Sequence, residues 1–79
     1  MDWKQYIEEN PDIMLGKPVI KGTRITVELL MEKLGQGASE EEILASYPFL
    51  RPEHIQAAHA FAAAYLSFDR TIFSARPTA

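Results

Sequence analysis

The side chains best suited to chemistry in this sequence are basic residues that gather near position 20. Lys17, Lys21 and Arg24 are three of the eight Lys and Arg residues of the chain. Such a group can contact a phosphate backbone or an acidic protein surface, although solvated turns also attract lysine. Arg51 joins the group if the fold brings it close. We take these four residues as candidate DNA contacts, with a solvated turn as the plain alternative.

The remaining reactive side chains do not form an enzyme site. His54 and His59 are five positions apart, so they do not align on one helical face to bind a metal. Ser39 has no acid–base partner near it in the sequence, and the chain contains no cysteine, which excludes a thiolate metal site and a cysteine nucleophile. Phosphate-binding and dinucleotide-binding motifs are absent. The sequence predicts a protein that is not an enzyme and needs no metal or cofactor.

Composition indicates one small globular domain. The chain has 79 residues, of which 47% are hydrophobic and 24% charged, and its formal net charge is −3. These values do not fit a disordered chain, and no apolar run approaches the roughly 18–20 residues of a membrane span. The N-terminus does not resemble a signal peptide. We expect a cytoplasmic protein without membrane contact, in which any DNA-binding surface is a local basic patch on an acidic body.

Residues 1–25 are predicted to form an N-terminal segment and a β-hairpin. Trp3, Tyr6 and Ile7 fit one face of a short helix that ends before Pro11. Strands are expected at residues 13–15 and 19–20, with a further short strand around residues 24–25. Glycine and proline at residues 16–18 and glycine at residues 21–23 supply the turns between them.

Residues 26–68 carry a helical period with start and stop signals. Thr26 can cap a first helix, and the glycines of residues 35–37 can end it in a left-handed conformation. Ser39 and Glu42 have the spacing of a capping box at the start of a second helix. A third helix is expected from Pro52 to about residue 66 or 68, because proline is favoured at a first helical position.

This order of elements is the layout of a trihelical helix-turn-helix, in which the last helix would face the DNA groove. The predicted fold class is therefore mainly α, with an N-terminal β-hairpin ahead of a three-helix bundle at residues 26–68. Residues 69–79 lose the helical period and are expected to form a loose tail, with Ile72 and Phe73 as anchors.

The third helix is apolar around too much of its circumference. One stripe consists of Ile55, Ala58, Ala62, Tyr65 and Leu66, and a second stripe beside it consists of Ala57, Phe61, Ala64 and Phe68. Together they cover roughly 200°, whereas packing on one core needs only about 100°. The remaining strip contains no Lys or Arg, and Gln56 is its best candidate for reading a base. We expect the second stripe to bind a partner, unless the N-terminal segment or the tail covers it.

Four motifs carry a resemblance to a known bacterial family. They are GKPVIKGTRI at residues 16–25, GASEEEIL at residues 37–44, YPFL at residues 47–50 and EHIQAA at residues 53–58. Over about residues 10–66 the chain resembles the antitoxin-like domain-of-unknown-function family four-three-three. The resemblance implies a homeodomain-like three-helix core behind a β-hairpin. It also implies the antitoxin half of a toxin–antitoxin pair, whose toxin is typically a PIN-like ribonuclease. Arg51 departs from the family, which commonly has a hydroxyl residue there.

We therefore expect an antitoxin-like protein that binds and neutralises a PIN-like nuclease. As a homodimer, it is expected to have a second function, which is to bind its own operator DNA. The alternative is a trihelical DNA-binding regulator without a toxin partner. A third hypothesis is an adaptor protein that does not contact nucleic acid. Arginines from the tail can enter the carboxylate cluster of such a nuclease. The candidate partner-binding residues are Ala57, Phe61, Ala64, Phe68, Arg70, Phe73 and Arg76, and the candidate DNA-binding residues are Lys17, Lys21, Arg24, Arg51 and Gln56.

Overall fold

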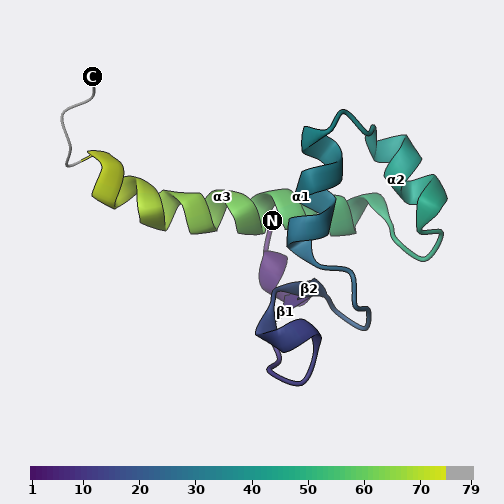
Figure 1. Ribbon diagram of the computed structural model, residues 1–79, viewed down its shortest axis with the longest axis horizontal. Helices are drawn as coiled ribbons and strands as arrows, with labels where there is room; N and C mark the ends of the chain where they lie inside the picture. The colour runs from purple at the N-terminus through teal and green to yellow at the C-terminus, as the bar shows by residue number, and fades with distance from the viewer. Residues whose placement is uncertain (75–79) are drawn as a thin grey trace.

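The computed structural model describes the backbone of residues 1–74 and the side chains of residues 1–67. The short strands β1 (Ile7–Glu8) and β2 (Val19–Ile20) precede the helices α1 (Val27–Gly35), α2 (Glu40–Ser46) and α3 (Pro52–Ser74). Figure 1 shows the strands below α1, with α3 running past both and its C-terminal half extending away from the other elements. The predicted fold class, an N-terminal hairpin followed by a helical bundle, is confirmed.

The hairpin uses a different first strand from the one predicted. β1 pairs with β2 in antiparallel register, with Ile7 opposite Ile20 and Glu8 opposite Val19. The predicted helix through Ile7 is wrong, because only a 3₁₀ turn at Trp3–Gln5 forms before the chain extends. Pairing with β2 leaves the side chains of Ile7 and Ile20 only 4% and 0% exposed. Burial against a partner strand therefore outweighs the local helical pattern.

The predicted strand at residues 13–15 is also wrong, because this segment is a tight turn. Met14, Leu15 and Gly16 have φ angles of 49°, 60° and 83°, values in the left-handed region that a strand does not use. The Gly16 N–H donates to the carbonyl of Ile13 over 3.0 Å, and the Asp12 N–H donates to Asn10 Oδ1 over 2.9 Å. The further strand expected at residues 24–25 is reduced to a single bridge between Val19 and Thr26.

The ends of α1 and α2 follow the predicted capping signals. The Thr26 hydroxyl accepts a hydrogen bond from the Leu29 N–H over 3.0 Å, and α1 is followed by Gly37 at a φ of 99°. At α2, the Glu42 N–H donates to Ser39 Oγ over 3.1 Å, and the Ser39 N–H donates to Glu42 Oε1 over 2.8 Å. This capping box fixes the turn between the two helices.

α3 begins at Pro52 as predicted, but its cap and its end differ from expectation. In place of a hydroxyl cap, His54 Nδ1 accepts the backbone N–H of Arg51 over 2.9 Å. The helix continues to Ser74, so the prediction of a loose tail is wrong for residues 69–74. Neither glycine nor proline occurs between Pro52 and Pro77, so no local signal ends the helix earlier. Residues 75–79 lie outside the described residues.

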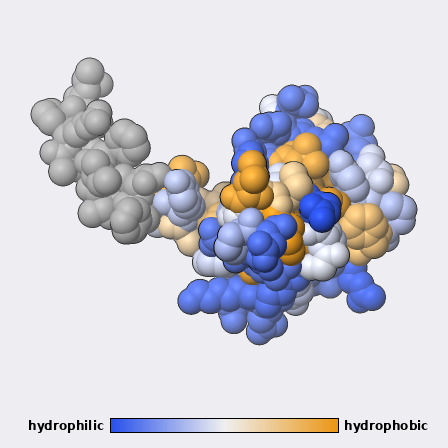
Figure 2. Space-filling model, turned by 60° about the horizontal axis from the view of Figure 1, so that its bottom comes forward, coloured by the Kyte–Doolittle hydropathy of each residue, from blue (hydrophilic) through white to orange (hydrophobic). Residues whose placement is uncertain are grey.

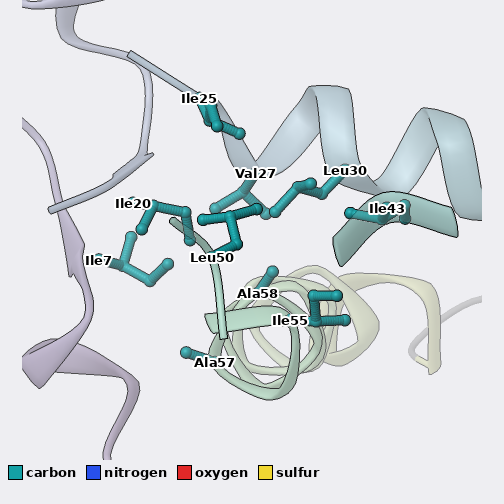
Figure 3. Close-up of a cluster of buried hydrophobic side chains, with 10 residues drawn as sticks. All are labelled: Ile7, Ile20, Ile25, Val27, Leu30, Ile43, Leu50, Ile55, Ala57 and Ala58. Carbon is teal, nitrogen blue, oxygen red and sulfur yellow. The ribbon is translucent and has the colours of Figure 1, made fainter. Parts of the chain in front are cut away.

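The core lies where the hairpin, α1, α2 and the first half of α3 meet. Figure 3 shows Ile55 and Ala58 pointing from α3 toward α1 and α2, and Ala57 pointing toward the hairpin side. Each of the two strands and three helices contributes at least one side chain, so the core joins the hairpin to the helices. The buried cluster consists of Ile7, Ile20, Ile25, Val27, Leu30, Ile43, Leu50, Ile55, Ala57 and Ala58.

Candidate protein-docking surface

The described part of α3 is buried at its start and uncovered further along. Ile55, Ala57 and Ala58 are 2%, 0% and 0% exposed, whereas Tyr65 and Leu66 are 63% and 62% exposed. All the side chains at residues 63–67 are exposed. Figure 2 shows orange and pale surface on the helix between the body and the grey residues. Large apolar side chains of α3 therefore remain in water, uncovered by the described part of the chain.

A surface groove runs beside this exposed part of α3. One wall is formed by Pro18 and by Val27 at the start of α1, and the volume of the groove is about 560 Å³. The helix supplies the other wall, and Glu28 stands at the rim. We call this feature the α3 groove, and its apolar lining consists of Pro18, Val27, Phe61, Ala62, Tyr65 and Leu66.

The N-terminal segment covers one edge of the α3 groove. The rings of Trp3 and Phe61 meet edge to face, with centroids 4.8 Å apart and an interplanar angle of 90°. Phe61 also stacks on Tyr65 at a centroid distance of 6.5 Å. Trp3 thus orders Phe61 from one side, while Tyr65 remains open to a further molecule. A second, smaller depression on the Trp3 side of Phe61 includes Glu9 and Ala64.

The charged residues at the groove rim are already paired with each other. Lys17 Nζ lies 2.8 Å from Glu28 Oε1. The hydrogen bond to Glu28, together with its negative charge, raises the pKa of Lys17 above its ordinary value of 10.5. The lysine ammonium and the carboxylate offset each other, so the groove presents an apolar floor with little net charge at this rim.

The predicted partner-binding residues are only partly where a partner could reach them. Ala57 was assigned to the partner-binding stripe, and this is wrong because it is fully buried in the core. Phe61 is half-buried beneath Trp3, and Ala64 is exposed. The side chains of Phe68, Arg70, Phe73 and Arg76 lie outside the described residues.

Tyr65 and Leu66 are the exposed apolar residues that the sequence analysis assigned to the core-facing stripe. The assignment fails because a helical period fixes which residues share a face, but not how far along the helix the body reaches. Pro18 and Val27 lie on one side of both residues, yet Tyr65 and Leu66 stay 63% and 62% exposed, because the described part of the chain does not cover this stretch of the helix. Their only sequence signal is the absence of charged residues between Glu53 and Asp69, which marks α3 as apolar beyond the length of its own core.

The basic candidate DNA-binding residues are all at the surface. Lys17, Lys21, Arg24 and Arg51 are all exposed, and Lys17 is paired with Glu28. Arg24 lines a depression together with Phe49 of the α2–α3 turn, so the hairpin turn lies beside the turn that carries Arg51.

Gln56 is exposed on α3 in a depression that also includes Glu40. Glu53 is exposed close by, at the start of the same helix. The part of α3 that would face DNA in a helix-turn-helix protein therefore stands beside carboxylates. Carboxylates repel the phosphate backbone, so the geometry favours protein docking over DNA recognition by this helix.

Over the described residues, no group of three or more His, Cys, Asp or Glu side chains is arranged to hold a metal ion. The same part of the chain contains no helix with the length and hydrophobicity needed to cross a membrane.

Comparison with known proteins identifies the family. Residues 7–62 match the family described as "Protein of unknown function (DUF433)". The chain belongs to this family. The resemblance drawn from the four sequence motifs is thereby confirmed. The matched segment ends at the point where the side chains of α3 become exposed, so it coincides with the hairpin, the bundle and the core that joins them.

Two relatives show how far the similarity extends. The DUF433 chain is 34% identical over 61 residues to the uncharacterized protein y4eO of Sinorhizobium fredii, covering 77% of this chain and 28% of the relative. It is 37% identical to a DUF433 member protein of Anabaena variabilis with a crystal structure, at a TM-score of 0.69, covering 84% of this chain and 66% of that one. The chain thus spans about a quarter of one relative and about two thirds of the other.

Proposed function

We propose that this DUF433 protein is an antitoxin-type docking module that binds and neutralises a PIN-like ribonuclease. The observation that carries the proposal is the α3 groove with Tyr65 and Leu66 exposed beside it. Large apolar side chains gathered on one exposed patch are typical of a protein-binding site. The class of partner comes from the antitoxin-like character of the family that the motifs indicate.

The α3 groove supplies an anchor for such a nuclease. Aromatic residues carry much of the binding energy at the centre of protein interfaces, and Tyr65 offers a ring that already stacks on Phe61. PIN-like nucleases hold their metal ions with clustered carboxylates. Arg70 and Arg76 follow the groove in the sequence and would pair with those carboxylates, although their side chains lie outside the described residues.

The test begins with a search for a PIN-like nuclease gene next to this one, and the absence of such a gene would count against the proposal. The two proteins are then co-expressed, co-purified and tested in a ribonuclease assay. We expect a complex in which the nuclease is inhibited. Tyr65→Glu places a charge in the interface, and since hot-spot substitutions cost about 2 kcal/mol or more, binding should weaken by at least about 30-fold. Phe49→Glu is the matched control, because Phe49 is 58% exposed and does not line the groove. Absence of a complex, or equal effects of both variants, would contradict the proposal.

A second role at operator DNA is supported by the hairpin turn. Arg24 and Phe49 line one depression, which brings the basic turn beside the start of α3. We expect Lys21→Ala with Arg24→Ala to weaken binding to DNA upstream of the gene and to lower its salt dependence, because phosphate contacts release counterions. Gln56→Ala should alter sequence preference only if α3 reads bases. Specific DNA binding without a nuclease complex would favour a transcriptional regulator. Either role places the protein in the bacterial cytoplasm.

A further inference from the structure

Two neighbouring turns carry cationic side chains that have no anionic partner among the described residues. The ion pair that these residues form joins Lys17 to Glu28, so Lys21, Arg24 and Arg51 are exposed without a salt bridge in the described part of the chain. Figure 1 shows the turn after β2 and the connection between α2 and α3 on the same side of α1. Although the chain as a whole has a net charge of −3, these turns offer unpaired positive charge to an anion.

The depressions beside these turns differ in charge from those along α3. The α3 groove and the two smaller depressions on α3 each include a glutamate in their lining. Among the described residues, no Asp or Glu lines either of the two depressions that share Arg24. An anionic ligand is therefore repelled least at Arg24. The larger of the two, which we call the Arg24 depression, has a volume of about 650 Å³ and is lined by Gly22, Thr23, Arg24, Ile25, Tyr47 and Phe49.

An exposed aromatic ring lies in the Arg24 depression. Phe49 is 58% exposed. Its ring meets that of Tyr47 steeply, at an interplanar angle of 72° and a centroid distance of 6.3 Å. Among the described residues no ring stacks on Phe49, so a planar group of a ligand can do so.

Hydrogen bonds fix the turn that carries Arg24. The Thr23 hydroxyl donates to the carbonyl of Ile20 over 2.8 Å and accepts from the Ile25 N–H over 3.0 Å. The Thr23 N–H also donates to the Ile20 carbonyl over 3.0 Å. Because the backbone on both sides of Arg24 is already ordered, binding costs less conformational entropy there. Gly22 has no side chain, and no atom lies within 4 Å of the place where its Cβ would be, so a ligand chain can pass close over this turn.

We infer that the Arg24 depression binds a single strand of nucleic acid, with a base stacked on Phe49 and a neighbouring phosphate paired with Arg24. Each nucleotide offers one planar base and one phosphate, which are the two groups that this surface can bind. In a duplex the faces of the bases are hidden within the stack. The carboxylates of an acidic peptide would pair with the cations but would leave the Phe49 ring uncovered. The inference rests on the nucleic-acid role proposed for the hairpin turn, and it adds the form of the nucleic acid and the contribution of the α2–α3 connection.

The experiment measures binding of the full chain by fluorescence anisotropy. The probes are a labelled oligothymidylate of about 12 nucleotides and a labelled duplex from upstream of the gene. We expect the single strand to bind more tightly than the duplex. Phe49→Leu keeps an apolar side chain but removes the ring, so it should weaken binding of the single strand about 5- to 150-fold, whereas Phe49→Tyr should retain it. Leu66→Ala is the matched control and should leave binding unchanged, because Leu66 is exposed but does not line the Arg24 depression.

A second measurement tests the phosphate contact. Arg24→Gln should weaken binding and reduce the slope of log affinity against log salt concentration by about 0.7, the value of one phosphate contact on a single strand. Lys4→Gln removes the same charge at an exposed position outside the depression, so the slope should hardly change. Far-ultraviolet circular dichroism checks that each variant is folded.

The outcomes separate this inference from the proposed function. Tighter binding of the duplex, or equal effects of Phe49→Leu and Leu66→Ala, overturns the inference and leaves the operator role standing. If neither nucleic acid binds while the nuclease complex forms, the inference and the operator role both fail and the docking function stands. A peptide of glutamate and phenylalanine that binds more tightly than the single strand also overturns the inference, in favour of a protein ligand.

Discussion

Replacing Trp3 with alanine tests whether the N-terminal segment holds the middle of α3. The Trp3 ring meets Phe61 edge to face at 4.8 Å, and it is only partly buried. A fully buried tryptophan changed to alanine costs about 3–5 kcal/mol, so a half-buried one should cost about half of that. We expect Trp3→Ala to lower the free energy of unfolding by about 2 kcal/mol, which includes roughly 1 kcal/mol for the aromatic pair.

This loss is large for so small a domain. At 0.05–0.15 kcal/mol per residue the whole chain is stabilised by roughly 4–12 kcal/mol. The expected fall in thermal midpoint is about 8–16 °C, because 1 kcal/mol corresponds to about 4–8 °C in a domain of this size. Trp3→Phe keeps a ring against Phe61 and should retain most of the stability. Lys4→Ala, at an exposed neighbouring position, should change the stability by no more than about 0.5 kcal/mol.

The assay is urea denaturation followed by circular dichroism at 222 nm. Fluorescence is unsuitable for the variant, because Trp3 is the single tryptophan of the chain. A loss below about 0.5 kcal/mol for Trp3→Ala would refute the reasoning. It would mean that Trp3 does not hold Phe61 in solution and that the groove is open on both sides.

Three further predictions concern the capping box, its dependence on pH and the orientation of α3. Ser39→Ala should cost about 1 kcal/mol in urea denaturation at pH 7, because the hydroxyl caps α2. The Ser39 backbone N–H, and after it the Ser39 side chain, hold the pKa of Glu42 below its ordinary value of 4.5. The ionised Glu42 therefore stabilises the fold above that value and loses this effect as the pH falls through its lowered pKa. The advantage over Glu42→Gln should be present at pH 7 and should shrink as the pH is lowered below 4.5. Ala57→Leu should lower the free energy of unfolding by about 1–3 kcal/mol, because it overpacks the core. Ala63→Leu, at an exposed position, should change it by less than about 0.5 kcal/mol. Equal losses for the two variants would show that α3 presents a different face to the core.

Local signals were enough to predict the parts of the fold that depend on neighbouring residues. Thr26, Ser39 and Glu42 make the predicted caps, and Gly37 takes the left-handed conformation after α1. The start of α3 at Pro52 was likewise predictable, since these features involve contacts within a few residues. The four motifs at residues 16–25, 37–44, 47–50 and 53–58 together were enough to identify the family.

Tertiary contacts decided the features that depend on distant residues. Ile7 becomes a strand residue because Ile20 lies beside it and the core buries both, and no local pattern outweighs that burial. Ala57 was predicted to bind a partner but is buried, and Tyr65 was predicted to face the core but is exposed. Both differences have a related reason. Periodicity places residues around a helix, whereas only the position of the hairpin and α1 determines where along the helix burial ends. The sequence by itself determined that α3 is apolar on more than one face, and the tertiary structure decided which apolar residues remain exposed.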